Sequence, residues 1–184
     1  MASEPAAGRR DAVLESALLT FARHGYRKTS MDEVARAARI SRPGLYFLFE
    51  SKETLFRAAA TRALEQDLAA AEQILGDAGK PLRERLAGAF DRWAGRYVGP
   101  LSRDVTGVIE QNPELLGAIV ETAPARFEAL VTDAIAEVTG RAMATRVAQT
   151  LISASVGLKH QVETRDAYLG RFTTAVELLV PQKA

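Results

Sequence analysis

The sequence predicts an all-α protein, with a small three-helix N-terminal domain followed by a larger helical domain. Apolar residues recur at the i, i+3, i+4 and i+7 spacing of one helix face through nearly every segment. Glycine and proline separate these segments, at points where helices end. No segment shows the alternation of apolar and polar residues that a half-buried strand requires. Hydrophobic residues make up 47% of the 184-residue chain, which is enough to bury a core.

The first helix is indicated by one apolar face and by a glycine that ends it. This face consists of Leu14, Ala17, Leu18 and Phe21. Gly25 follows the basic residues Arg23 and His24, which suit the negative end of a helix dipole. We therefore expect this helix to end at Gly25.

Two short helices should follow, each beginning at a serine. The segment from Ser30 to Glu33 has the Ser-x-x-Glu pattern of a capping box, and its helix should bury Val34, Ala35 and Ala38. Ser41 is a suitable N-cap for the next helix, and Pro43 suits the first helical turn because its missing N–H costs little there. Leu45 and Phe49 should face inward.

The fourth helix is expected at 51–75, with Ser51 as its cap. Its apolar residues are Leu55, Phe56, Leu64, Leu68 and Leu75. The segment 76–81, which contains two glycines and a proline, should end it. Beyond this break, the pattern predicts helices near 82–98, 101–111, 114–121, 124–139, 142–160 and 164–180, with Pro124 separating two of them.

Residues 30–49 fit a helix-turn-helix, in which two short helices pack closely across a tight turn. The Ala-rich first helix allows close approach. On the second helix, Arg42, Pro43, Tyr46 and Phe47 share the outward side. Arginine can bind guanine with two hydrogen bonds, and apolar groups can contact the thymine methyl group in a major groove. This surface therefore indicates DNA binding.

Residues from about Arg10 to Phe56 resemble the TetR family of bacterial regulators. The matching residues are Phe21, His24-Gly25-Tyr26, Thr29-Ser30, Val34-Ala35, Ala38, Ile40-Ser41, Leu45-Tyr46, Phe49, Ser51-Lys52-Glu53 and Leu55-Phe56. The resemblance implies a homodimeric repressor that a small apolar ligand releases from a palindromic operator in double-stranded DNA. It also implies that the third helix reads the operator and that the C-terminal domain holds the ligand.

The resemblance also implies roles for individual residues. Thr29 and Ser41 resemble positions that bind phosphate or cap helices, and Tyr46 and Lys52 resemble phosphate contacts. Arg42, Pro43, Gly44 and Phe47 occupy base-facing positions. Ser30, Ser41 and Ser51 can be interpreted either as helix caps or as DNA contacts. The family often has glycine in place of Pro43 and histidine or tyrosine in place of Leu48. We therefore expect the operator sequence, and the affinity for it, to differ from those of family members with the usual residues.

We expect a DNA-binding domain at 1–52 and a ligand-binding and dimerisation domain at 53–184, linked by the helix at 51–75. Residues 1–52 contain nine Lys and Arg against six Asp and Glu, whereas the whole chain has a net charge of only +1. A basic N-terminal region attached to a slightly acidic remainder is the asymmetry expected of a nucleic-acid reader.

The C-terminal domain offers two sets of candidate residues. The ligand pocket would be lined by Phe90, Trp93, Tyr97, Val108 and Phe127, although an aromatic stripe at helical spacing also fits an ordinary core. The dimer interface would lie on the helices at 124–139 and 142–160, at Ala148, Leu151, Ile152, Ser155 and Val156.

Other functional classes lack sequence support. The chain has no cysteine, which excludes disulfides and thiolate chemistry, and it contains no G-x-S-x-G, H-E-x-x-H or complete P-loop motif. We therefore expect no enzymatic activity, no cofactor and no metal site. No signal peptide or membrane-spanning run is present, so we expect a cytoplasmic protein. The alternatives are a ligand-insensitive DNA-binding regulator and a helical interaction protein.

Overall fold

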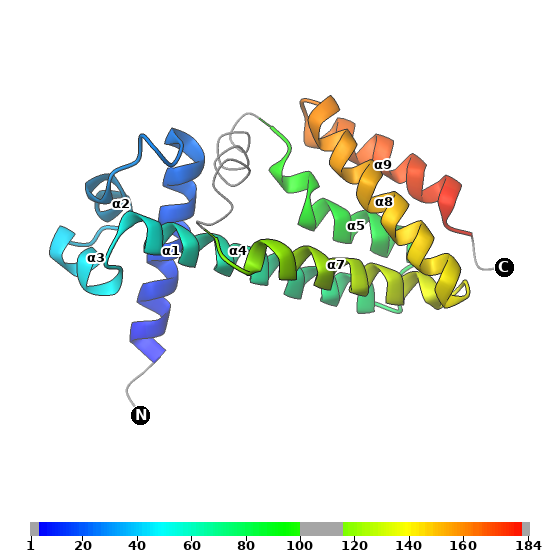
Figure 1. Cartoon of the computed structure of the whole chain (residues 1–184), viewed down its shortest axis with the longest axis horizontal. Coiled ribbons are helices and arrows are strands. Elements are labelled where there is room, and N and C mark those ends of the chain that lie inside the picture. The colour runs from blue at the N-terminus through cyan, green and yellow to red at the C-terminus, as the bar shows by residue number, and fades with distance from the viewer. Residues whose placement is uncertain (1–3, 100–115, 182–184) are drawn as a thin grey trace. The chain divides into compact units, whose positions relative to one another are not determined.

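The computed structural model describes residues 4–99 and 116–181, and within these ranges every regular element is a helix (Figure 1). The elements are α1 (Glu4–His24), α2 (Met31–Ala37), α3 (Arg42–Leu48), α4 (Lys52–Gly76), α5 (Leu82–Trp93), the 3-10 helix η1 (Gly95–Tyr97), α7 (Ile119–Ala136), α8 (Arg141–Gln161) and α9 (Arg165–Leu179). The all-α fold class is confirmed. None of the helices in the described ranges is both long and apolar enough to span a membrane.

The chain forms two compact units. The first contains the described residues 4–64 and 116–120, and the second contains 65–99 and 121–181. The division falls inside α4, so this helix contributes its first half to one unit and its second half to the other. The expectation that residues 1–52 form a DNA-binding domain by themselves stays a prediction.

The core of the first unit is built by α1, α2, α3 and the start of α4. Phe21, Val34, Leu45 and Phe56 are fully buried, and Phe49 is almost so. The rings of Phe21 and Phe56 meet edge to face, with their centroids 5.1 Å apart. The inward orientation predicted for Leu45 and Phe49 is therefore confirmed, and it fixes which side of α3 faces solvent.

The turns of the first unit depend on two residues with positive φ. Gly25, at φ 75°, ends α1 as predicted. The turn between α2 and α3 has Arg39 at φ 54°. Around it, the Ile40 N–H donates to the Ala35 carbonyl (3.0 Å) and the Arg39 N–H donates to the Arg36 carbonyl (3.1 Å). This is the Schellman arrangement, and it satisfies the last carbonyls of α2 while reversing the chain direction.

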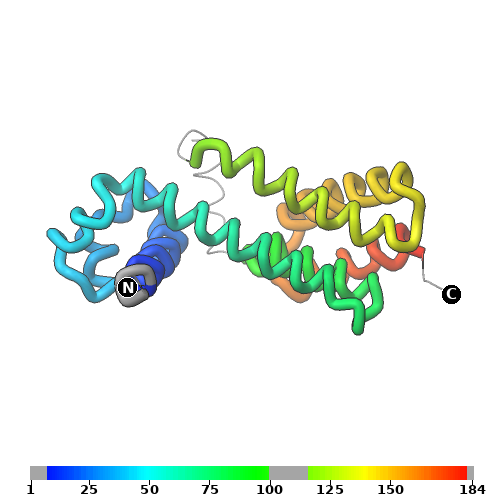
Figure 2. The backbone as a smooth tube through the Cα atoms, turned by 90° about the horizontal axis from the view of Figure 1, so that it is seen from below, coloured from blue at the N-terminus to red at the C-terminus, as the bar shows by residue number. Residues whose placement is uncertain are grey.

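The core of the second unit is aromatic and is formed by α5, α7, α8 and α9. The Phe90 ring lies 5.0 Å from that of Phe127 and 4.3 Å from that of Phe172. The Trp93 ring stacks on that of Phe127, with the two centroids 4.7 Å apart. Figure 2 shows the tight turn that joins α7 to α8, after which α8 packs along α9.

Two arginines of α5 bind the carboxyl ends of other helices. Arg83 donates to the carbonyl oxygens of Glu177 (2.9 Å) and Val180 (2.7 Å) at the end of α9. Arg85, which is buried, donates to the Leu75 carbonyl near the end of α4 and pairs with Glu137. Cations suit these positions because unpaired carbonyls give a helix a negative C-terminal end.

The predicted break at Pro124 is wrong, because α7 continues through this proline. Ala123, Phe127, Val131 and Ile135 form one buried stripe along α7. Burial of this stripe outweighs the single backbone hydrogen bond that a proline near the start of a helix removes. The predicted helix at 101–111 lies outside the described residues. The separate helix predicted at 114–121 is wrong in its described part, because residues 116–118 form a turn and residues 119–121 begin α7.

The predicted helix at 82–98 is shorter in the structure. Its α-helical part ends at Trp93, and η1 follows. A Cβ atom on Gly95 would lie 2.9 Å from the Tyr168 ring, so glycine allows η1 to approach α9 closely. The helices predicted at 142–160 and 164–180 are confirmed to within a residue as α8 and α9.

Tyr168 makes the stability of the second unit depend on pH. The side chain is fully buried, its hydroxyl lies 2.7 Å from that of Ser155, and burial raises its pKa to about 12. From pH 10 to 12 the unfolded tyrosine ionises while the folded one stays neutral, so stability should fall by up to about 1.4 kcal/mol per pH unit. Burial also raises the pKa of Tyr97, which acts in the same direction.

Tyr168→Phe should remove the contribution of Tyr168 to the loss of stability at high pH, while that of Tyr97 remains. We expect urea unfolding at pH 9 to 11.5 to show a shallower loss of stability with pH in the variant than in the unchanged protein. The variant should also be less stable at pH 8, because Ser155 loses its partner. If the free energy of unfolding fell equally with pH above 10 in the variant and in the unchanged protein, the role of Tyr168 in this pH dependence would be contradicted.

Candidate nucleic-acid interface

The outward side of α3 is formed by residues that a soluble protein rarely exposes together. Phe47 is 90% exposed and Tyr46 is 41% exposed, and Arg42 and Pro43 are exposed beside them. Leu45 and Phe49 hold the opposite side of the helix in the core. A short helix anchored from behind and carrying an arginine and two aromatic rings in front has the form of a major-groove reading helix.

Arg42 is held from two sides. Its Nε lies 3.2 Å from Oδ1 of Asp32 on α2, and its Nη1 donates to Oδ2 of the same carboxylate at 3.4 Å. Its guanidinium carbon also lies 5.7 Å from the centre of the Tyr46 ring. The Arg42 side chain nevertheless remains 62% exposed. The guanidinium is therefore oriented but accessible.

Each of the three serines caps a helix, which agrees with their interpretation as helix caps. Ser30 and Glu33 form the predicted capping box at the start of α2, and this bonding lowers the pKa of Glu33. The hydroxyl of Ser41 accepts the Gly44 N–H (3.1 Å), and that of Ser51 accepts the Thr54 N–H (3.1 Å). Their predicted contacts with DNA stay predictions.

Thr29 and Lys52 stabilise the loop between α1 and α2. The Thr29 hydroxyl is buried and donates to the Gly25 carbonyl (2.8 Å), so its side chain serves the loop rather than an exposed surface. The Lys52 ammonium donates to the carbonyls of Tyr26 (3.0 Å) and Thr29 (3.1 Å), and more weakly to that of Arg27 (3.5 Å). An ammonium has three N–H groups, so these carbonyls engage all of them.

Lys52→Met should lower the free energy of unfolding by about 1–3 kcal/mol, because the loop carbonyls lose a charged donor. If Lys52 also binds a phosphate, the dependence of DNA affinity on salt should become shallower by about one unit. Lys28→Met is the matched control, since Lys28 is an exposed lysine of the same loop. Unchanged stability in Lys52→Met, measured by thermal unfolding, would contradict the role in the loop.

Three contacts of this region were not predicted from the sequence. They are the pairing of Asp32 with Arg42, the Tyr26 ring 4.5 Å from the Lys52 ammonium, and Arg10 placed 4.9 Å above the Phe49 ring. Each joins different elements, so no local spacing signals it. Only the exposed pair of opposite charges at Asp32 and Arg42, on adjacent short helices, gave a hint.

The predicted pocket residues of the second unit mostly form packed core. Phe90 and Phe127 are fully buried and in contact, and Trp93 is stacked on Phe127. The Tyr97 hydroxyl bonds to Asp67. Val108 lies outside the described residues. These contacts favour the alternative interpretation of the stripe as core, and a ligand cavity here stays a prediction.

Three of the predicted dimer-interface residues are buried within the chain. Ala148 and Leu151 are fully buried, and Ser155 is buried with its hydroxyl against that of Tyr168. This apolar face of α8 is covered by α9 of the same chain, so it is not available to a second chain. Val156 is 56% exposed and Ile152 is partly exposed, and both remain candidates.

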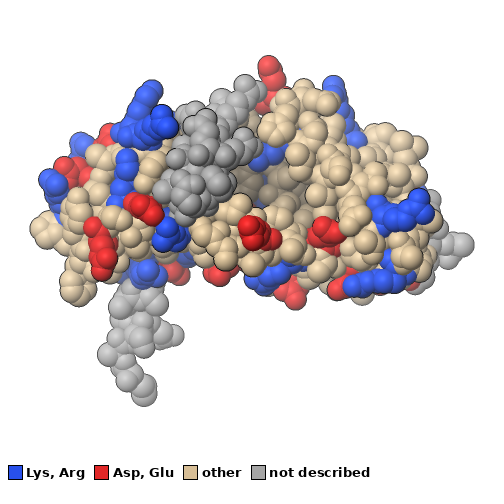
Figure 3. Space-filling view, in the orientation of Figure 1, with Lys and Arg blue, Asp and Glu red and all other residues tan. Residues whose placement is uncertain are grey.

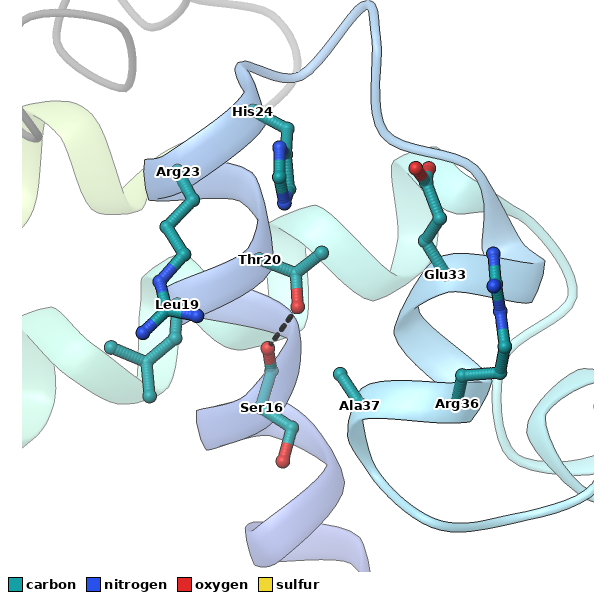
Figure 4. Close-up of a pocket in the computed structure, with 8 residues that line it drawn as sticks. All are labelled: Ser16, Leu19, Thr20, Arg23, His24, Glu33, Arg36 and Ala37. Atoms are coloured by element: carbon teal, nitrogen blue, oxygen red, sulfur yellow. Dashed lines mark hydrogen bonds between the residues drawn. The ribbon is translucent and has the colours of Figure 1, made fainter.

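A groove of about 530 Å³ opens on the first unit between α1 and α2 (Figure 4). Its lining is mostly polar and consists of Ser16, Leu19, Thr20, Arg23, His24, Glu33, Arg36 and Ala37. Glu33 already belongs to the capping box, and the Thr20 hydroxyl donates to the Ser16 carbonyl (2.7 Å). None of the predicted pocket residues lines this groove.

Comparison with known proteins supports the interpretation of the N-terminal region. Residues 13–59 match the model of the family described as bacterial regulatory proteins, tetR family. The "HTH-type transcriptional repressor ComR" of Escherichia coli (strain K12) is 37% identical over 81 residues, which are 44% of this chain and 39% of that protein. The chain thus spans less than half the length of this curated relative.

Solved structures resemble nearly the whole chain. Escherichia coli NemR in its reduced form superposes with a TM-score of 0.76 at 16% identity, covering 96% of this chain and 99% of that one. The multidrug binding protein EbrR complexed with imidazole superposes with a TM-score of 0.59 at 20% identity, covering 96% and 97%. At these identities the likeness establishes the fold.

Proposed function

We propose that this chain, whose residues 13–59 match the model of the tetR family of bacterial regulatory proteins, is a homodimeric transcriptional repressor that binds a palindromic operator through α3. The exposed outward side of α3 supports this proposal most directly. Arg42 and Phe47 lie five residues apart on one helix, which corresponds to a rise of about 7.5 Å, or about two base-pair steps. Each half-site should therefore contain a G·C pair and an A·T pair separated by about this spacing.

We propose repression rather than activation because two curated relatives are named as repressors. Besides the repressor named above, a "Probable acrEF/envCD operon repressor" of Escherichia coli (strain K12) is 40% identical over 47 residues, 26% of this chain and 21% of that protein. We assign the chain a binding role in the cytoplasm and no catalytic role.

The proposed dimer uses the exposed sides of α8 and α9. Four of the large hydrophobic side chains exposed in the described ranges lie on these helices: Met143, Val156, Leu178 and Leu179. Residues 147–158 of α8 include no charged side chain, and in Figure 3 the Lys and Arg of the right-hand part lie around a mainly tan surface. A two-fold dimer would present two copies of α3, and successive major grooves require them about 34–36 Å apart.

Selection from a random duplex library tests the proposal. We expect enrichment of an inverted repeat, and an affinity for it that falls steeply as salt increases, because each phosphate contact releases counterions. A protein that enriches no sequence and binds no duplex at low salt would refute the function.

Arg42→Ala should weaken binding to the selected operator by about 1–3 kcal/mol, or about five- to 150-fold, and relax the preference at one base pair of each half-site. The loss arises because a guanine loses two hydrogen bonds that no other base can form. Competition binding with operators changed at one pair measures it. Equal weakening on operator and random duplex would instead make Arg42 a phosphate contact.

We further propose that a small apolar ligand releases the operator by binding within the second unit. Support comes from the structural likeness to EbrR, a multidrug binding protein solved in complex with imidazole. A ligand that binds at the predicted pocket residues Phe90 and Phe127 must separate their rings, since these are in contact. A screen of apolar compounds for release of the operator tests this step, and a screen without any release favours a ligand-insensitive regulator.

A further inference from the structure

Asp32 occupies an unusual position for an acidic residue in a protein that binds DNA. It lies in the first turn of α2, its side chain is 51% exposed, and both carboxylate oxygens face Arg42 on α3. A carboxylate at a phosphate-rich interface is repelled by the DNA, so it weakens binding to every sequence. Its pairing with Arg42 gives it a candidate role at the reading helix.

The geometry of the pair supplies that role. An arginine has five N–H groups. One on Nη1 of Arg42 donates to Oδ2 of Asp32, and Nε lies within ion-pair distance of Oδ1. Guanine is bound through O6 and N7 by two donors of one arginine. The second N–H of Nη1 and those of Nη2 can supply these two donors while Asp32 holds the guanidinium.

The Tyr46 ring restrains the same guanidinium from a further side, at 5.7 Å. A free arginine side chain loses substantial rotamer entropy when it is fixed on a base. An arginine held between a carboxylate and a ring has already lost much of this freedom before DNA binds. Such preorganisation favours the one contact that fits the fixed orientation over contacts with nearby phosphates.

We propose that Asp32 is a specificity-determining positioning residue, which holds Arg42 for guanine and suppresses its use as a phosphate contact. This inference rests on the proposed function. Asp32 lowers general affinity for duplex DNA and raises discrimination between the operator and other sequences. It acts through Arg42 and touches no base itself.

The experiment compares Asp32→Asn with the unchanged protein on three duplexes: the selected operator, the operator with its Arg42-dependent pair changed, and a random sequence. Affinity for the random duplex should rise about twofold or more, because one repelling charge is lost. Discrimination between the first two duplexes should fall about fivefold or more, because the bidentate contact is no longer favoured. In the Arg42→Ala background, Asp32→Asn should not change discrimination further.

Asp11→Asn is the matched control. Asp11 also pairs with an arginine, Arg62, and is 53% exposed, but it lies on α1. Asp11→Asn should leave the discrimination between the operator and its changed form as it is in the unchanged protein. Thermal unfolding should show that Asp11→Asn and Asp32→Asn both stay folded. If Asp32→Asn discriminates as well as the unchanged protein, the inference is wrong although the proposed function stands. If the unchanged protein itself prefers no duplex, the proposed function fails and the inference fails with it.

Discussion

Asp67→Ala should destabilise the second unit by about 3 kcal/mol or more, the largest effect on stability that we expect from a single polar side chain. Asp67 lies on α4 and is only 1% exposed. It pairs with Arg92 and Arg96, each at 2.8 Å, and accepts the hydroxyl of Tyr97. Its removal leaves two arginines facing each other without their shared counter-charge.

Chemical unfolding followed by circular dichroism measures this effect, with Asp133→Ala as the control. Asp133 also pairs with an arginine, Arg141, but both side chains are more than 60% exposed. Exposed pairs contribute about 0–1 kcal/mol, so the control should change stability little. Equal effects of the two substitutions would show that Asp67 has no special structural role.

Leu178→Asp should separate the proposed dimer and lower operator affinity by about two to four orders of magnitude, because the two half-sites are then bound independently. Leu178 is 80% exposed on α9, so the substitution disturbs no packing within the chain. A carboxylate within an apolar interface would be desolvated without a partner.

Sedimentation velocity provides the direct measurement, because the protomer has a mass of 19.9 kDa and a dimer has twice that mass. Leu19→Asp is the control, since Leu19 is also exposed (57%) but lies on α1. A Leu178→Asp protein that remains dimeric and retains its affinity would place the interface elsewhere.

Local signals predicted the first unit well. The capping box at Ser30, the cap at Ser41 and the glycine at Gly25 each act within a few residues, so the sequence reveals them directly. The inward orientation of Leu45 and Phe49 followed from their spacing. The turn at Arg39 was harder to predict, because a residue other than glycine adopts the left-handed conformation there.

Tertiary packing explains what could not be predicted. The apolar stripe through Ala148 and Leu151 indicates that α8 is covered, but a stripe does not reveal whether the cover is α9 or a second chain. Lys52 resembles a phosphate contact of the tetR family in sequence, but its ammonium donates to loop carbonyls more than twenty residues away. Pro124 suggests a helix break only when the buried stripe on both sides of it is ignored.

The stacking of Trp93 on Phe127 provides a built-in optical probe. Trp93 is the single tryptophan of the chain, so its emission follows the aromatic cluster of the second unit, whereas the ellipticity at 222 nm follows helices of both units. Because α4 is shared by the two units, we expect the two signals to change together in one cooperative transition. Separate midpoints would reveal that the halves of this helix unfold independently.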